Sequence, residues 1–105
     1  MLNLTELVPI WHNFDIEYRV HSTRRMFERG ISHEDIENLL TNGNMIEQYP
    51  DDYPLPSVLL NGHTLNNEPL HAVIAINKSE SKLIVVTAYK PDANKWIDNF
   101  SKRKI

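Results

Sequence analysis

The sequence contains no cysteine and only three glycines among its 105 residues. Without cysteine the chain has no disulfide framework and no thiolate chemistry, and three glycines are too few for a glycine-rich phosphate-binding loop. No apolar run approaches the length of a membrane-spanning helix, and the first residues lack the basic and apolar regions of a signal peptide. We therefore expect a single domain over residues 1–105 that is cytoplasmic and has no membrane partner.

The sequence also lacks the spacings that mark metal and nucleophile sites. None of its five histidines belongs to a His-x-x-x-His pair, and no serine nucleophile motif is present. The adjacent carboxylates Asp51 and Asp52 lie in a proline-rich loop, where solvation alone explains them. We expect neither a metal nor a cofactor.

The net charge of −3 argues against nonspecific binding along nucleic acid, which needs many cationic contacts. A small local basic site remains compatible with this charge. Positive charge concentrates at residues 19–29 and 102–104.

Hydrophobic periodicity predicts a first helix over residues 3–13 and two short helices that meet at Gly30. Ser32 and Asp35 form the capping-box pattern at the start of the later helix, and Gly43 is expected to end that helix in a left-handed conformation.

The remainder of the chain reads mainly as strands. Nearly continuous apolar runs at 70–77 and 83–89 are typical of central strands, and Asp92 is expected to cap a C-terminal helix. The predicted fold class is α+β, with two short helices near the N-terminus packed on a mainly antiparallel sheet of about four to five strands, and a C-terminal helix.

The helix that ends at Gly30 has a polar arc and an apolar side. At about 100° per residue, one arc carries His21, Arg24, Arg25, Glu28 and Arg29. The other side carries Thr23, Met26 and Phe27, which we expect to face the core. Neighbouring guanidinium groups repel one another unless an anion or a carboxylate lies among them, and arginine binds phosphate oxygens bidentately. The arc therefore indicates either an anion site beside a titratable histidine or a solvated charged face.

His71 interrupts an apolar strand, so its imidazole either hydrogen-bonds within the core or acts as an acid or base at a site. Thr87 and Tyr89 share one face of the next strand. A hairpin loop of three or five residues would place His71 on their face, and a four-residue loop would place it on the other.

Ordered motifs run through most of the chain. They are His21-x-x-x-Arg25-Met26-x-x-Arg29-Gly30-Ile31-Ser32, Asn42-Gly43, Tyr49-Pro50-Asp51-Asp52, Pro69-Leu70-His71, and Thr87-x-Tyr89-x-Pro91-Asp92 with Trp96. Over residues 16–103 they resemble an uncharacterised family of small bacterial domains, which is distantly similar in layout to the RelE and BrnT toxins. That similarity implies a compact α+β ribonuclease that cleaves RNA without metal, with RNA and a small antitoxin protein as partners.

Two main hypotheses follow. In the first, the protein is a metal-independent RNA endonuclease of the RelE/BrnT type, with acid–base and phosphate-binding groups His21, Arg25, Arg29, His71 and Tyr89, and with Arg24 and Thr87 binding substrate. In the second, it is a non-enzymatic interaction module whose arginines pair internally with Glu28, Glu37 or Asp52. A small-molecule anion-binding domain would use the same arginines.

Overall fold

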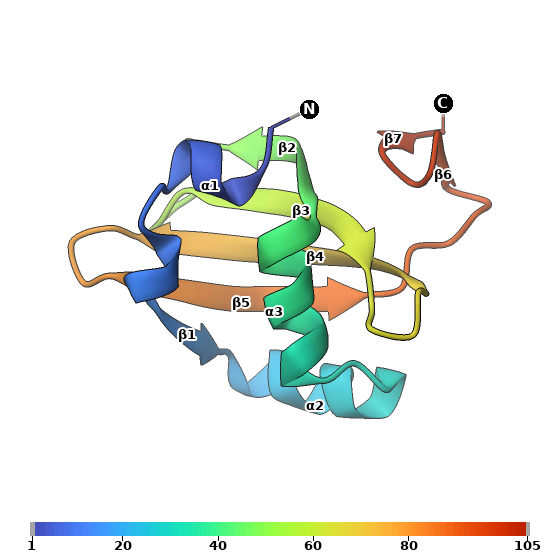
Figure 1. Ribbon diagram of the computed structural model, residues 1–105, viewed down its shortest axis with the longest axis horizontal. Helices are drawn as coiled ribbons and strands as arrows, with labels where there is room; N and C mark the ends of the chain where they lie inside the picture. Colours follow the sequence, from blue (N-terminus) through green and yellow to red (C-terminus); the bar gives the residue numbers. More distant parts are fainter. Residues whose placement is uncertain (1, 105) are drawn as a thin grey trace.

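The computed structural model describes residues 2–104 and shows a five-stranded sheet, a separate two-stranded sheet and three α-helices (Figure 1). In chain order the elements are α1 (Leu4–Leu7), a 3-10 helix (Trp11–Asn13), β1 (Asp15–Tyr18), α2 (Val20–Arg29), α3 (His33–Asn42), β2 (Asn44–Tyr49), β3 (Ser57–His63), β4 (Pro69–Asn77), β5 (Lys82–Tyr89), β6 (Trp96–Ile97) and β7 (Lys102–Arg103). The larger sheet has the strand order β1-β5-β4-β3-β2.

The hydrophobic core lies between one face of this sheet and helices α1 and α3. Alternate residues of each strand point to this face, and the buried set includes Leu60, Ala72, Ile74 and Val85. In Figure 1, α3 crosses this face of the sheet. The strand residues that alternate with this buried set, such as Asn61 and His71, therefore point to the opposite face.

The predicted fold class is correct as α+β but wrong in its architecture. The sheet is mixed, because β1 lies parallel to β5. The first helix, predicted over residues 3–13, is much shorter: α1 ends at Leu7, ahead of Pro9, which lacks a backbone N–H donor, and only a 3-10 helix follows.

The predicted C-terminal helix is also wrong within residues 2–104. In its place, a turn connects the short strands β6 and β7. Asp98, Asn99 and Phe100 all have positive φ, at 52°, 56° and 65°. A right-handed helix cannot continue through such residues.

Two of the predicted helix ends are confirmed. The capping box of Ser32 and Asp35 is confirmed, and α2 ends at Gly30 in the left-handed conformation. The left-handed conformation predicted for Gly43 is wrong: its φ is −79°, because β2 begins at the next residue. Gly43 is needed for space instead, since a Cβ there would lie 2.5 Å from the Leu39 carbonyl oxygen.

Helix α2 packs against the edge of the sheet beside β5, so only a narrow stripe of it is buried. Ser22 and Met26 form that stripe. The prediction that Phe27 and Thr23 face the core is wrong, and the Phe27 side chain is 87% exposed.

A β-bulge in β5 decides whether Tyr89 shares a face of the sheet with His71. The β4–β5 loop, Lys78–Ser81, has four residues, which in a regular hairpin would place His71 on the face opposite Tyr89. Strand β5 contains one extra residue, Val86, which has no partner in β4. The register therefore shifts between Val73 and Ile74. His71 is therefore paired directly with Tyr89 and shares its face with Thr87.

Candidate functional site

Helix α2 takes the place of a neighbouring strand along the second half of β5. Strand β1 pairs with β5 only as far as Val85. From that point on, side chains of α2 bind carbonyl groups of β5. Ser22 Oγ lies 2.8 Å from the Val85 oxygen and 2.5 Å from the Val86 oxygen, and Arg29 Nη1 donates to the Ala88 oxygen at 2.7 Å. These bonds satisfy an exposed strand edge and fix α2 beside the bulge.

A hollow of about 260 Å³ lies between α2 and β5. Its lining residues come from these two elements alone: His21, Ser22, Arg25, Arg29, Val86 and Thr87. We call it the α2–β5 hollow. Three of the four α2 residues lie on the polar arc of that helix, and β5 contributes the bulge residue and its neighbour.

The α2–β5 hollow is cationic and has no counter-charge of its own. Within the described part of the chain, no carboxylate lines it, and neither Arg25 nor Arg29 takes part in an ion pair. Arg29 donates one guanidinium hydrogen bond to the Ala88 carbonyl, and its remaining N–H donors are available for an anion. The internal pairing of Arg25 and Arg29 with Glu28, Glu37 or Asp52 is thus not found in residues 2–104. Their charges favour an anion from outside.

The structure brings four of the seven predicted site residues together. His21, Arg25, Arg29 and Thr87 line the hollow. Arg24 projects from the same helix but is not part of its lining. His71 and Tyr89 form a separate pair on the same sheet face.

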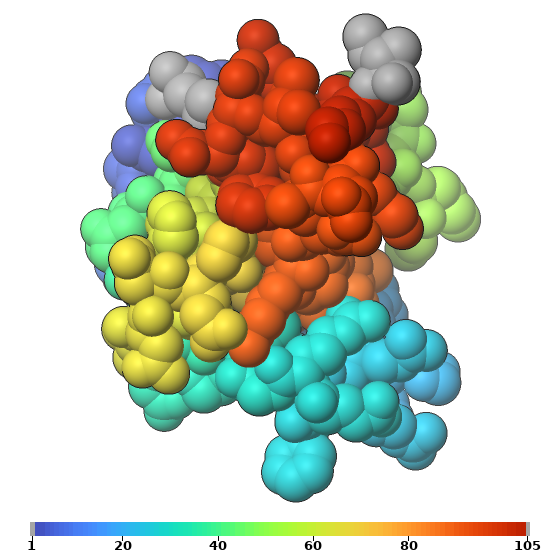
Figure 2. All heavy atoms as spheres, turned by 90° about the vertical axis from the view of Figure 1, so that its right-hand side faces the viewer, coloured from blue at the N-terminus to red at the C-terminus, as the bar shows by residue number. Residues whose placement is uncertain are grey.

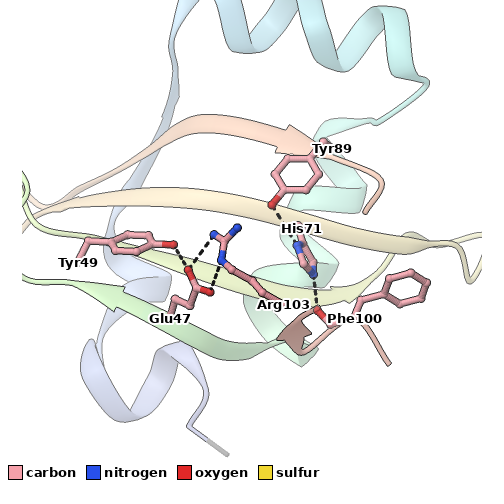
Figure 3. Close-up of polar contacts among 6 residues, drawn as sticks. All are labelled: Glu47, Tyr49, His71, Tyr89, Phe100 and Arg103. Carbon is pink, nitrogen blue, oxygen red and sulfur yellow. Dashed lines mark hydrogen bonds and ion pairs between the residues drawn. The ribbon is translucent and has the colours of Figure 1, made fainter. Parts of the chain in front are cut away.

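His71 is buried, and both ring nitrogens have partners (Figure 3). Nε2 lies 2.8 Å from the carbonyl oxygen of Phe100, and because a carbonyl only accepts, Nε2 carries a hydrogen. Nδ1 lies 3.1 Å from the Tyr89 hydroxyl and, in the neutral ring, accepts a hydrogen bond from it. Burial lowers the pKa of His71, which favours this neutral form.

The C-terminal segment, residues 92–104, covers His71 and closes this side of the sheet. Trp96 packs edge-on against the imidazole at 4.5 Å between ring centres. Arg103 lies over the Trp96 ring and binds both carboxylate oxygens of Glu47, at 2.8 and 3.0 Å. These hydrogen bonds hold the pKa of Glu47 below its usual range. In Figure 2 this segment, in red, lies on the molecular surface above α2, in cyan.

The Glu47–Arg103 pair was not found from the sequence. The two residues are 56 positions apart, and neither belongs to a local motif. The sequence feature closest to it is the cationic cluster at residues 102–104, but nothing nearby in the sequence identifies the carboxylate with which it pairs. Tyr49, which also donates to Glu47, completes this group (Figure 3).

Residues 2–104 contain no candidate metal site. No group of three His, Asp or Glu side chains there is placed to hold a metal ion. None of the described helices has the length and apolar character required to cross a bilayer.

The fold and the site together define a small α+β domain with a cationic hollow at the edge of a mixed sheet. A family model described as a domain of unknown function, DUF4258, matches residues 18–90, and the chain belongs to this family. The match includes α2, α3 and β2–β5, and thus the α2–β5 hollow, but not the C-terminal segment. No curated protein and no solved structure matches the chain. The similarity to RelE and BrnT toxins stays a prediction.

Proposed function

We propose that the α2–β5 hollow binds a phosphate of the RNA backbone and that the protein is a metal-independent RNA endonuclease. One observation carries this proposal. Two guanidinium groups without carboxylate partners in the described chain lie beside the imidazole of His21 in an open hollow. Arginine matches the geometry of phosphate oxygens, and histidine titrates near neutral pH.

The chemistry assigned to the hollow uses the ribose 2′-hydroxyl as nucleophile. His21 accepts the proton of that hydroxyl as its oxygen attacks the adjacent phosphorus. Arg25 and Arg29 stabilise the charge that develops on the phosphoryl oxygens, and Thr87 offers a hydroxyl donor from β5. The 5′ oxygen departs and takes a proton from solvent, which leaves a 2′,3′-cyclic phosphate.

His71 and Tyr89 are not assigned a catalytic role in this proposal. His71 is buried and its two nitrogens are occupied. The Tyr89 hydroxyl is directed to His71, and burial raises the pKa of Tyr89, which makes it a weaker acid. We assign this pair to holding the C-terminal segment on the sheet.

The test compares Arg25→Ala with Arg24→Ala in cleavage of single-stranded RNA in the presence of EDTA. The two variants lose the same charge from the same helix, but only Arg25 lines the hollow. We expect a fall of roughly a hundredfold or more in rate for Arg25→Ala, on the scale of losing one transition-state donor, and a small change for Arg24→Ala. His21→Gln should lose activity similarly.

Product analysis distinguishes the alternatives. A 2′,3′-cyclic phosphate end supports the proposed chemistry. Intact RNA with the unaltered protein contradicts the endonuclease. Phosphate-dependent binding that Arg25→Ala abolishes, without any cleavage, would indicate an anion-binding module instead. A thermal unfolding curve for each variant, with an unchanged Tm expected, distinguishes a loss of activity from a loss of fold.

A further inference from the structure

A second hollow, of about 160 Å³, adjoins the first on the face of the sheet opposite α3. Val73 and Ala75 of β4 lie in its floor, and Asp52 and Tyr53 of the proline-rich loop form one wall. Arg19, which precedes α2, forms another part of the rim. We call it the Tyr53 hollow.

The two hollows meet at the bulge. Val86 lines both of them and is 39% exposed. A chain molecule bound in one can therefore continue into the other over this single residue. Arg19 lies at the second hollow, so guanidinium groups are present along the whole path.

The walls of the Tyr53 hollow combine an aromatic ring with a fixed acceptor. Tyr53 is 96% exposed, a high value for an aromatic side chain. Asp52 Oδ2 accepts a hydrogen bond from Ser57 Oγ at 2.6 Å, which holds the carboxylate in place. An apolar floor, an exposed ring and a held carboxylate suit a flat heterocycle with an amino group better than a second phosphate.

We infer that the Tyr53 hollow is a nucleobase subsite for single-stranded RNA. This inference rests on the proposed function, because the phosphate next to that base occupies the α2–β5 hollow. Tyr53 stacks on the base, as aromatic side chains do with unpaired bases. Arg19 contacts the flanking phosphate.

Asp52 makes the subsite selective between the two pyrimidines. Cytosine presents an amino group at position 4, which a carboxylate accepts. Uracil presents a carbonyl oxygen at the same position, which a carboxylate repels. The subsite therefore favours cytosine over uracil.

Binding of 2′-O-methylated tetranucleotides tests this inference without cleavage, because the nucleophilic hydroxyl is blocked. The probes are four cytidines and four uridines, and fluorescence anisotropy gives each Kd. The cytidine probe should bind more tightly. Tyr53→Ala should weaken binding of both probes roughly tenfold, and Tyr53→Phe should retain it. Asp52→Asn should remove the difference between the probes.

Phe27→Ala is the matched control. Phe27 is also a highly exposed aromatic residue, but it lines neither hollow. It should leave both Kd values unchanged.

The outcomes separate this inference from the proposed function. If Arg25→Ala weakens binding while Tyr53→Ala does not, the phosphate site stands and the base subsite is overturned. Equal binding of the two probes overturns the selectivity assigned to Asp52. If the unaltered protein binds neither probe, both proposals fail.

Discussion

At the scale of single residues, His71 shows how burial and hydrogen bonding select one form of a side chain. Its Nε2–H donates to a carbonyl and its Nδ1 accepts from a hydroxyl, an arrangement that the neutral ring alone satisfies in this way. Burial lowers the pKa of His71 and outweighs the hydrogen bond to the Phe100 carbonyl, which acts in the opposite direction. The folded protein therefore binds a proton at this site less readily than the unfolded chain.

This difference predicts a dependence of stability on pH. Because the folded-state pKa is the lower one, the stability that His71 contributes is present above the ordinary histidine pKa of about 6.5 and is lost as the pH falls below it. Urea denaturation between pH 8 and pH 5 measures the free energy of unfolding. We expect the unaltered protein to lose more stability on acidification than His71→Gln, and the same slope in both proteins would contradict this account.

At the scale of elements, α2 acts as a substitute for a continuation of β1 beside the second half of β5. A sheet edge normally exposes unpaired backbone groups. Here Ser22 and Arg29 bind those groups with side chains, and the bulge at Val86 places two carbonyls within reach of one hydroxyl. The same contacts set the distance between the arginines of α2 and Thr87.

Ser22→Ala tests this role of α2. The variant removes the hydroxyl that lies against the Val85 and Val86 carbonyls in a buried position. We expect the free energy of unfolding to fall by about 1–3 kcal/mol, the cost of an unsatisfied buried group. Thr23→Ala, on the exposed side of the same helix, should change it little. If chemical denaturation gives the same loss for both substitutions, the contact between Ser22 and the bulge does not stabilise the fold.

At the scale of the whole molecule, an acidic protein carries a basic edge. The net charge is −3, so most of the surface repels a polyanion. In the proposed function, the attraction for RNA comes from the arginines that line the two hollows. This small number of arginines limits how many phosphates the two hollows can neutralise at once.

RNA binding should therefore depend weakly on salt. Three arginines, Arg19, Arg25 and Arg29, line the two hollows. At about 0.7 per neutralised phosphate of a single strand, the plot of log affinity against log salt should have a slope of about −2. Arg25→Ala should reduce the magnitude of the slope by about 0.7. A much steeper slope would indicate binding over a broad surface rather than in the hollows.

The parts of the site on one helix could be predicted from the sequence. Arg25 and Arg29 are four residues apart and His21 precedes Arg25 by four, so the helical period alone places them in one row. The capping box at Ser32 and the end of α2 at Gly30 could be predicted for the same reason. Such features depend on backbone geometry within a few residues.

Periodicity failed where distant contacts outweigh it. Trp96 and Phe100 have helical spacing, but the Phe100 carbonyl binds His71 and the Asn99 carbonyl accepts from Asn61. These bonds hold a turn of left-handed residues in place of a helix. Phe27 was assigned to the core because its helix was assumed to lie on the sheet face, whereas α2 lies at the edge.

The sequence by itself determined the short-range features, namely the cationic row on α2, the ends of its helices and the two apolar strands. Tertiary structure decided which of these groups meet. A single extra residue in β5 placed Tyr89 on the face of His71, and the C-terminal segment then covered the buried His71. The physical reason is the two-residue period of a strand: a shift of one position reverses a face, and no local pattern in the chain records whether that shift occurs.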